Sequence, residues 1–311
     1  METVIQIKEV SKMFRDLKAV DRVSLMIDRG ETVAILGPNG AGKTTLISIM
    51  LGILNPTSGE VQLFGKKPNQ VRNRIGVMLQ HSIIPDDVKV KELIDLFRSY
   101  YPHPFSHQEL LQMVLLENQA NTMAQKLSGG QKRRLAFALA MAGNPDLIFL
   151  DEPTVGMDVT SRKLFWEKIQ SMKRSGKTIL FTTHYLEEAE AVADRIVVIH
   201  KGKKVSEGPL TYIQQTFMKR AVTFTWKQEE VAMFSDFPYV ENVMKDGDRV
   251  TLYTNDSDAL LRELFLRDLP ISDVFVDKGS LNDLFDDLTK GEMVDARALD
   301  AVQSGVSENV S

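Results

Sequence analysis

The 311-residue sequence contains no cysteine. This absence excludes disulfide bonds, thiol nucleophiles and zinc sites built on thiolates, and it fits a reducing compartment. The sequence also lacks a long apolar run, because its longest such stretch, residues 135–142, is far shorter than the roughly 20 residues of a membrane-spanning helix. We therefore expect a chain that does not cross a bilayer.

An excess of positive charge is missing as well. The formal net charge is -4 at pH 7, whereas proteins that bind nucleic acid usually present a basic face. We therefore expect no nucleic-acid partner, and we interpret the basic cluster Lys132, Arg133 and Arg134 as a solvated helix face. Residues 1–10 show the pattern of a strand with interspersed charges and lack the apolar region of a secretory signal, which favours a cytoplasmic chain.

Length and composition indicate an ordinary globular protein with two domains. The sequence is 43% hydrophobic and 26% charged, a balance that allows a full core. Near residue 219 the pattern changes, because Val222, Phe224 and Trp226 alternate with threonines as in a half-buried strand. The predicted organisation is a large α/β domain at 1–218, a small α+β domain at 219–290 and a flexible polar tail at 291–311.

Within the large domain, apolar strands alternate with helices. Residues 32–36 form a continuous apolar run that leads into a glycine-rich turn, and residues 45–54 have the composition of a core helix. Residues 81–145 are predicted to be a mainly helical subdomain. Further strands are expected at 74–79, 147–150 and 178–182, with helices at 88–101, 106–116 and 131–143. Buried strands separated by helices imply a mostly parallel sheet.

The turn after residue 36 carries a complete phosphate-loop pattern. The pattern G-x-x-x-x-G-K-[ST] is matched by Gly37, Pro38, Asn39, Gly40, Ala41, Gly42, Lys43 and Thr44. Its glycines let backbone N–H groups close around phosphates, and the following helix adds its positive N-terminal end. Lys43 is placed to reach β- and γ-phosphate oxygens, and the Thr44 hydroxyl to bind Mg²⁺. We assign the next residue, Thr45, to the same site and expect the phosphates of a nucleotide and Mg²⁺ as its ligands.

Two carboxylates follow the predicted strand at 147–150. Asp151 and Glu152 emerge at the carboxyl end of that strand, where open α/β sheets bind their ligands. Asp151 is predicted to hold the Mg²⁺ shell, and Glu152 to orient and deprotonate the attacking water. Taken alone, the pair could instead cap the loop before Pro153. Beside a complete phosphate loop, the catalytic interpretation is favoured.

The phosphate loop and the acid pair indicate a nucleotide phosphatase, and a third motif narrows the class. Leu127, Ser128, Gly129, Gly130 and Gln131 resemble the signature motif of ABC ATPases. The motif precedes a predicted helix, so its serine and glycine amides offer a second anion site. The resemblance implies a P-loop NTPase core with a parallel sheet, an antiparallel β N-terminal part and a helical subdomain. It also implies a head-to-tail dimer in which each ATP lies between one chain's phosphate loop and the other's signature.

The remaining site residues are carried over from that resemblance. Gln80 looks like the glutamine that contacts Mg²⁺ and senses a membrane partner, and His184 looks like the histidine that touches the γ-phosphate. Asp158 matches the aspartate that crosses the dimer interface, and Phe14 occupies the position of the aromatic that stacks on adenine. Phe14 departs from the commoner tyrosine and keeps its stacking face. Met157 departs from the commoner leucine, and neither change threatens ATP binding.

Near the carboxyl end, residues 280–285 with Leu288 and Thr289 resemble the closing segment of bacterial drug-exporter ATPases of the daunorubicin- and bacitracin-resistance type. This likeness implies export of an antibiotic or another amphipathic compound. The expected partners are a second copy of the chain and a separately encoded membrane permease, which would place the chain at the cytoplasmic face of the cell membrane. A short permease helix is expected to bind a groove lined by Gln80 and residues 83–101.

Two other classes of protein share these motifs. A soluble ABC ATPase acting on ribosomes or DNA would carry two cassettes or a long coiled-coil insert, whereas this sequence has one cassette and a short helical insert. A regulatory module would bind nucleotide without hydrolysis, which the presence of both Glu152 and His184 argues against. The favoured interpretation is an ATP-hydrolysing exporter subunit.

Overall fold

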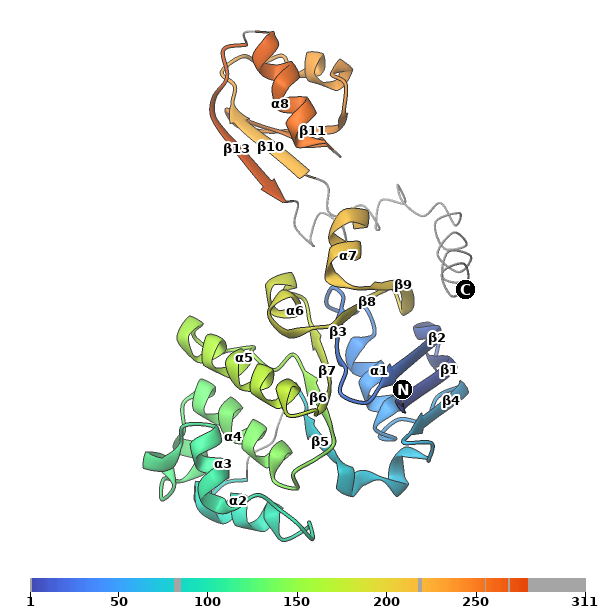
Figure 1. Cartoon of the computed structure of the whole chain (residues 1–311), viewed down its shortest axis with the longest axis vertical. Coiled ribbons are helices and arrows are strands. Elements are labelled where there is room, and N and C mark those ends of the chain that lie inside the picture. Colours follow the sequence, from blue (N-terminus) through green and yellow to red (C-terminus); the bar gives the residue numbers. More distant parts are fainter. Residues whose placement is uncertain (1, 81–84, 218–219, 255, 268, 279–311) are drawn as a thin grey trace, which may run out of the picture. The chain divides into compact units, whose positions relative to one another are not determined.

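Figure 1 shows the computed structural model of the chain, which describes residues 2–80, 85–217, 220–254, 256–267 and 269–278. The chain divides into two compact units, Met1–Ile213 and Gln214–Ser311. Among the described residues, no helix is both long enough and apolar enough to cross a membrane. The exporter-like segment at 280–289 and the tail predicted at 291–311 lie outside the described residues.

An antiparallel sheet opens the first unit. Val23, Leu25 and Ile27 alternate with more polar residues and are all buried, which gives this sheet one core-facing side. Its strand order is β2-β1-β4, with antiparallel pairing throughout. The strands are β1 (Thr3–Phe14), β2 (Leu17–Asp28) and β4 (Ser58–Leu63). The predicted antiparallel β N-terminal part is confirmed.

A six-stranded sheet forms the centre of the same unit, in the order β5-β6-β7-β3-β8-β9. All neighbours pair in parallel except β8 and β9, which confirms the predicted mostly parallel sheet. β3 and β6 are buried along their whole length, as strands covered on both faces must be. The strands are β3 (Thr32–Leu36), β5 (Ile75–Met78), β6 (Leu147–Asp151), β7 (Thr178–Thr183), β8 (Arg195–His200) and β9 (Lys203–Gly208).

Helices surround the central sheet. α1 packs within a core cluster shared by the two sheets, whereas α2, α3 and α4 gather into one lobe next to β5 (Figure 1). The helices of this unit are α1 (Lys43–Met50), α2 (Val90–Arg98), α3 (His107–Met113), α4 (Gly129–Met141), α5 (Val159–Arg174) and α6 (Leu186–Val192). A further helix, α7 (Leu210–Phe217), begins in the first unit and ends in the second. Short 3₁₀ turns are η1 (Pro68–Gln70), η2 (Arg72–Arg74), η3 (Glu117–Gln119) and η4 (Ala124–Lys126).

Local signals explain where several helices begin and end. α3 begins after Ser106, whose Oγ accepts a hydrogen bond from the Glu109 N–H at 3.1 Å, while the Glu109 carboxylate accepts one from the Ser106 N–H at 2.7 Å. α1 is shorter than predicted: it ends at Met50 rather than continuing to residue 54. The cause is Gly52, whose φ of +68° leaves the helical region.

The second unit contains an antiparallel sheet and one helix. The strands lie in the order β11-β12-β10-β13, and the predicted alternation is observed because Val222, Phe224 and Trp226 are buried against Leu260 and Leu264. The Trp226 indole N–H donates to the Glu230 carbonyl at 3.0 Å. The elements are β10 (Arg220–Thr225), η5 (Ala232–Asp236), β11 (Val240–Asp246), β12 (Arg249–Thr254), α8 (Ser257–Leu266) and β13 (Ser272–Lys278).

Candidate active site

The phosphate loop joins the end of β3 to the start of α1, and close approach of the backbone requires its glycines. A Cβ at Gly42 would lie 2.3 Å from the Ala19 carbonyl oxygen, and one at Gly37 would lie 2.4 Å from the Ile199 carbonyl oxygen. Gly42 also has a φ of +104°, which side-chain-bearing residues rarely adopt. The loop is therefore held against β2 and β8 in a conformation that leaves room for a ligand on its outer side.

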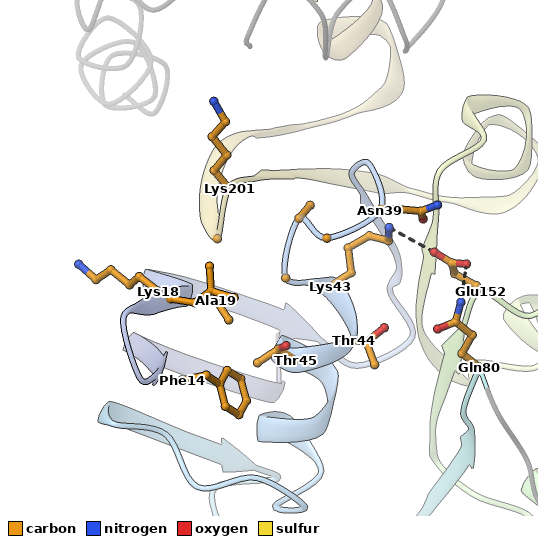
Figure 2. Close-up of a pocket in the computed structure, with 15 residues that line it drawn as sticks. Phe14, Lys18, Ala19, Asn39, Lys43, Thr44, Thr45, Gln80, Glu152 and Lys201 are labelled. Carbon is orange, nitrogen blue, oxygen red and sulfur yellow. Dashed lines mark hydrogen bonds and ion pairs between the residues drawn. The ribbon is translucent and has the colours of Figure 1, made fainter.

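Lys43 lies inside this loop. Its Nζ donates to the carbonyl oxygens of Gly37 at 2.8 Å and Pro38 at 3.2 Å, so the ammonium closes the loop on itself. The same Nζ lies 3.2 Å from Oε1 of Glu152 (Figure 2). Both side chains of this ion pair are nearly fully buried. The phosphate loop and the residue that follows β6 therefore meet at one point.

Glu152 is the centre of the cluster. Its Oε2 accepts a hydrogen bond from the Gln80 Nε2 at 3.1 Å, and Nδ1 of His184 lies 3.7 Å from its Oε1. Figure 2 shows the side chains of Lys43, Gln80 and Glu152 pointing toward one another. Three residues predicted from separate sequence motifs therefore converge on Glu152, because β3, β5, β6 and β7 end at the same edge of the sheet.

Asp151 is fully buried beside this cluster. Its Oδ1 accepts a hydrogen bond from the Thr182 hydroxyl at 2.6 Å, and the same hydroxyl oxygen accepts one from the Glu152 N–H at 2.9 Å. Among the described residues, Oδ2 of Asp151 and Nδ1 of His184 have no hydrogen-bond partner. A buried carboxylate oxygen without a partner is costly unless a ligand satisfies it. Oδ2 of Asp151 and the Thr44 hydroxyl are oxygen ligands of the kind that Mg²⁺ prefers. These residues therefore fit the metal.

A pocket of about 560 Å³ lies above the phosphate loop, within the size range of small-molecule sites. Residues 39–45 form its floor, and Gln80 and Glu152 form one side. The exposed ring of Phe14 lines the other side, so a flat aromatic surface and the acidic cluster lie at opposite sides of the loop (Figure 2). This arrangement suits a ligand with an aromatic base at one end and phosphates at the other.

The structure adds two lysines that the sequence motifs did not single out. Lys18 and Lys201 line the same pocket, and Figure 2 shows both side chains beside it. Lys201 lies in the turn after β8, where it has a φ of +46°. No sequence pattern marks either residue, since both positions depend on how β2 and β8 approach the phosphate loop.

The signature residues lie outside this pocket. Ser128 caps α4: its Oγ accepts from the Gln131 N–H at 3.3 Å, and the Gln131 Oε1 accepts from the Ser128 N–H at 2.9 Å. The Gly129 and Gly130 positions have open space around them. Neither these residues nor Asp158 are among those that line the chain's own pocket.

Asp158 caps the next helix, α5. Its carboxylate accepts hydrogen bonds from the Ser161 N–H at 2.9 Å and the Ser161 hydroxyl at 2.7 Å, and these bonds lower the pKa of Asp158. The structure thus gives Asp158 a local capping role, which does not depend on a second chain.

The predicted solvated face at residues 132–134 is wrong for Arg133. Its side chain is buried, and its guanidinium donates to five backbone carbonyl oxygens near the site. Arg134 donates to the carbonyl oxygens of Val114 and Leu115 at 3.0 and 3.1 Å. A run of basic residues carries no information on burial, because a buried arginine needs only enough acceptors from distant segments.

Known proteins are similar to this chain in sequence and in fold. A family model described as ABC transporter matches residues 20–155. The Nod factor export ATP-binding protein I of Burkholderia thailandensis is 37% identical over 268 residues, which cover 81% of this chain and 86% of that protein. The chain belongs to the ABC transporter ATP-binding family. As a member of this family it is an ATP-hydrolysing transporter subunit that uses ATP with Mg²⁺.

Solved structures of ABC cassettes agree with the fold. A dimeric ATP-binding cassette in a post-hydrolysis state, bound to ADP and Pi, is 28% identical, with a TM-score of 0.61 over 66% of this chain and 98% of that chain. A Clostridium perfringens cassette that is part of an ABC transporter complex is 25% identical, with a TM-score of 0.59 over 68% of this chain and 91% of that chain. The fold predicted from the ABC motifs is confirmed.

Replacing Gly42 by alanine tests the geometry of the phosphate loop. In Gly42→Ala the new Cβ overlaps the Ala19 carbonyl and forces a φ that costs alanine about 1–2 kcal/mol. We expect the affinity for ATP, measured with a fluorescent ATP analogue, to fall at least about tenfold. The control is Gly65→Ala, where φ is +70° but nothing lies within 4 Å. That variant should lose stability and keep its affinity; equal loss in both variants would contradict the steric argument.

Proposed function

We propose that this ABC subunit energises an exporter as one of two cassettes in a head-to-tail dimer, on the cytoplasmic face of the membrane, with a separately encoded permease as its partner. One observation carries the proposal. Lys43, Gln80 and Glu152 line one pocket and His184 lies 3.7 Å from Glu152, whereas the signature at residues 127–131 is not part of the pocket lining. A nucleotide clamped on both sides therefore needs the signature of a second chain.

Each residue of the pocket then has a distinct role. We assign the ring of Phe14 to the adenine, the backbone amides of residues 37–45 with Lys43 to the phosphates, and Thr44 with Asp151 to the metal. Mg²⁺, when bound, neutralises charge that develops on the transferred phosphoryl group. Gln80, two residues after the end of β5, would contact the metal as well.

Glu152 is proposed to accept the proton of the attacking water. In the structure its carboxylate is engaged by the Lys43 ammonium and the Gln80 amide. Phosphates placed in the loop offer Lys43 a stronger set of anionic partners, which frees the carboxylate to act as a base. His184 lies beside Glu152 and is proposed to contact the γ-phosphate. The structure thus supports a site in which nucleotide binding itself activates the base.

The dimer is supported by the relatives and by the signature itself. The related cassette bound to ADP and Pi is dimeric. In this chain, Gly129 and Gly130 begin α4, and a Cβ at either position would meet no neighbouring atom within 4 Å. Amides at the N-terminus of a helix bind anions. We propose that Ser128, Gly129, Gly130 and Gln131 bind the partner chain's ATP, and that Asp158 lies at the interface between the chains.

Export is the direction suggested by relatives. Burkholderia thailandensis carries a similar protein named for Nod factor export. We propose an antibiotic or another amphipathic compound as cargo, in line with the drug-exporter likeness of residues 280–289. The proposed domains are 1–218, 219–290 and a tail at 291–311. A groove lined by Gln80 and residues 83–101, of which 83 and 84 lie outside the described residues, is proposed for a permease helix.

The role of Glu152 is tested by Glu152→Gln. The amide keeps the shape of the side chain but cannot accept a proton, so we expect turnover to fall by about 10² to 10⁴-fold with ATP binding retained. Phosphate release and nucleotide binding measure the two effects. Glu167→Gln removes an exposed carboxylate on α5 and should leave both unchanged. A near-normal rate in Glu152→Gln would remove this residue from the role of general base.

The role of the signature in trans is tested by Ser128→Arg in the Glu152→Gln background. A bulky cation at the start of α4 blocks approach of a second chain, so ATP should no longer produce a dimer in light-scattering measurements. Nucleotide affinity of the single chain should survive. Ser175→Arg places the same side chain at an exposed position after α5 and should still dimerise. ATP-dependent dimers of Ser128→Arg would refute the cross-chain site.

The cargo is tested by growth of a strain that lacks this chain. Such a strain should become more sensitive to at least one amphipathic compound in a panel of antibiotics. The unaltered chain should restore resistance and the Glu152→Gln chain should not, because export depends on hydrolysis. Unchanged growth throughout the panel, with normal ATPase activity of the purified chain, would overturn the drug-export proposal and leave the ATPase assignment intact.

A further inference from the structure

Arg133 occupies an unusual place in α4, two residues after the signature ends at Gln131. Its side chain is directed away from solvent and is 8% exposed. All five of its N–H groups are used, because a guanidinium has five donors and each has one carbonyl acceptor. These acceptors are the carbonyl oxygens of Leu79 at 2.9 Å, Gln80 at 2.7 Å, Asp151 at 2.8 Å, Glu152 at 2.6 Å and Pro153 at 2.9 Å.

The five acceptors belong to two chain segments that both lead into the site. One segment leaves β5 at Gln80, and the other leaves β6 at Glu152. Arg133 joins them from a third element, which begins at the signature. Burial lowers the pKa of the Arg133 guanidinium, and the charges of Asp151 and Glu152 oppose that shift. A buried cation is tolerated here because every donor is paired and the carboxylates lie close.

The backbone that Arg133 binds has a special conformation. Glu152 has a φ of +44°, in the left-handed region that residues with side chains rarely adopt. In that conformation its carbonyl is bonded to Arg133 while its carboxylate is bonded to Lys43 and Gln80. Such a conformation persists only where surrounding contacts enforce it. The hydrogen bonds from Arg133 are among these contacts.

We propose that Arg133 is a positioning residue for ATP hydrolysis, which sets the side chains of Glu152 and Gln80 from the helix that begins at the signature. It is not among the residues that line the pocket, and it acts through the backbone of these two residues. The proposal rests on the proposed roles of Glu152 and Gln80. Arg133 also links the signature to the same chain's pocket. A displacement of the start of α4 would move Arg133 and, through its hydrogen bonds, the backbone of Gln80 and Glu152.

The central test is Arg133→Lys in the full-length chain. Lysine keeps the charge but has three donors on one nitrogen and cannot join five carbonyls in two segments. A small displacement of a catalytic group costs up to about 10²-fold in rate. We expect the kcat of the folded protein to fall about 10- to 100-fold, with the affinity for ATP close to that of the unaltered chain. The thermal midpoint should also fall, because at least two of the five carbonyls lose their donor. A purely structural role would lower the thermal midpoint and leave the kcat of the folded protein unchanged.

Chemical rescue provides a second readout. In Arg133→Ala, guanidinium ions at concentrations below the denaturing range should raise kcat, whereas sodium chloride at equal ionic strength should not. The unaltered chain and Glu152→Gln should show no such gain. If Arg133→Ala does not fold, Arg133→Lys still decides the question through its kcat and its affinity for ATP.

Arg134→Lys is the matched control, since Arg134 is the next residue of the same helix and bonds only to carbonyls of Val114 and Leu115 among the described residues. It should keep its kcat. The double variant Arg133→Lys with Glu152→Gln should be no slower than Glu152→Gln alone, because residues that act as a unit are not additive. Normal kcat in Arg133→Lys beside a slow Glu152→Gln would overturn the positioning role alone, and a normal rate in Glu152→Gln would overturn the proposed function itself.

Discussion

The buried ion pair between Lys43 and Glu152 is the interaction on which the site depends. Two opposite charges that are nearly fully buried are stable only with each other and with further hydrogen bonds. Lys43 has the carbonyls of its own loop, and Glu152 has the amide of Gln80. Because this pair joins the loop after β3 to the residue after β6, any ligand that withdraws Lys43 changes the environment of the proposed base.

The order of the central sheet makes this pair possible. β7 lies between β6 and β3, and all three strands are parallel. Their carboxyl ends therefore present the phosphate loop, the acid pair and His184 along one edge. The signature helix α4 packs next to β5, and its Arg133 donates to backbone carbonyls of the segments at the ends of β5 and β6. The residues of the pocket thus meet within one chain, and the signature residues do not line that pocket.

Features that depend on a contiguous stretch of residues could be predicted from the sequence. The phosphate loop lies between a buried strand and a helix as its pattern requires, and the capping box at Ser106 begins α3. The prediction of a solvated face at residues 132–134 is wrong at Arg133, which is buried. Five acceptors from two distant segments surround this side chain, and no local pattern of charges reveals such a set. Lys18 and Lys201 were missed for the same reason.

The sequence by itself determined the family, the nucleotide, and the residues that the motifs name, because backbone geometry around phosphates demands particular residues at fixed spacing. Only the tertiary structure decided which of these residues meet. It showed that Gln80 and Lys43 both bind Glu152, that Glu152 adopts a left-handed backbone conformation, and that the Arg133 guanidinium donates to the Glu152 carbonyl. These features depend on contacts between segments far apart in the chain, which are fixed by the order of strands in a sheet and by burial.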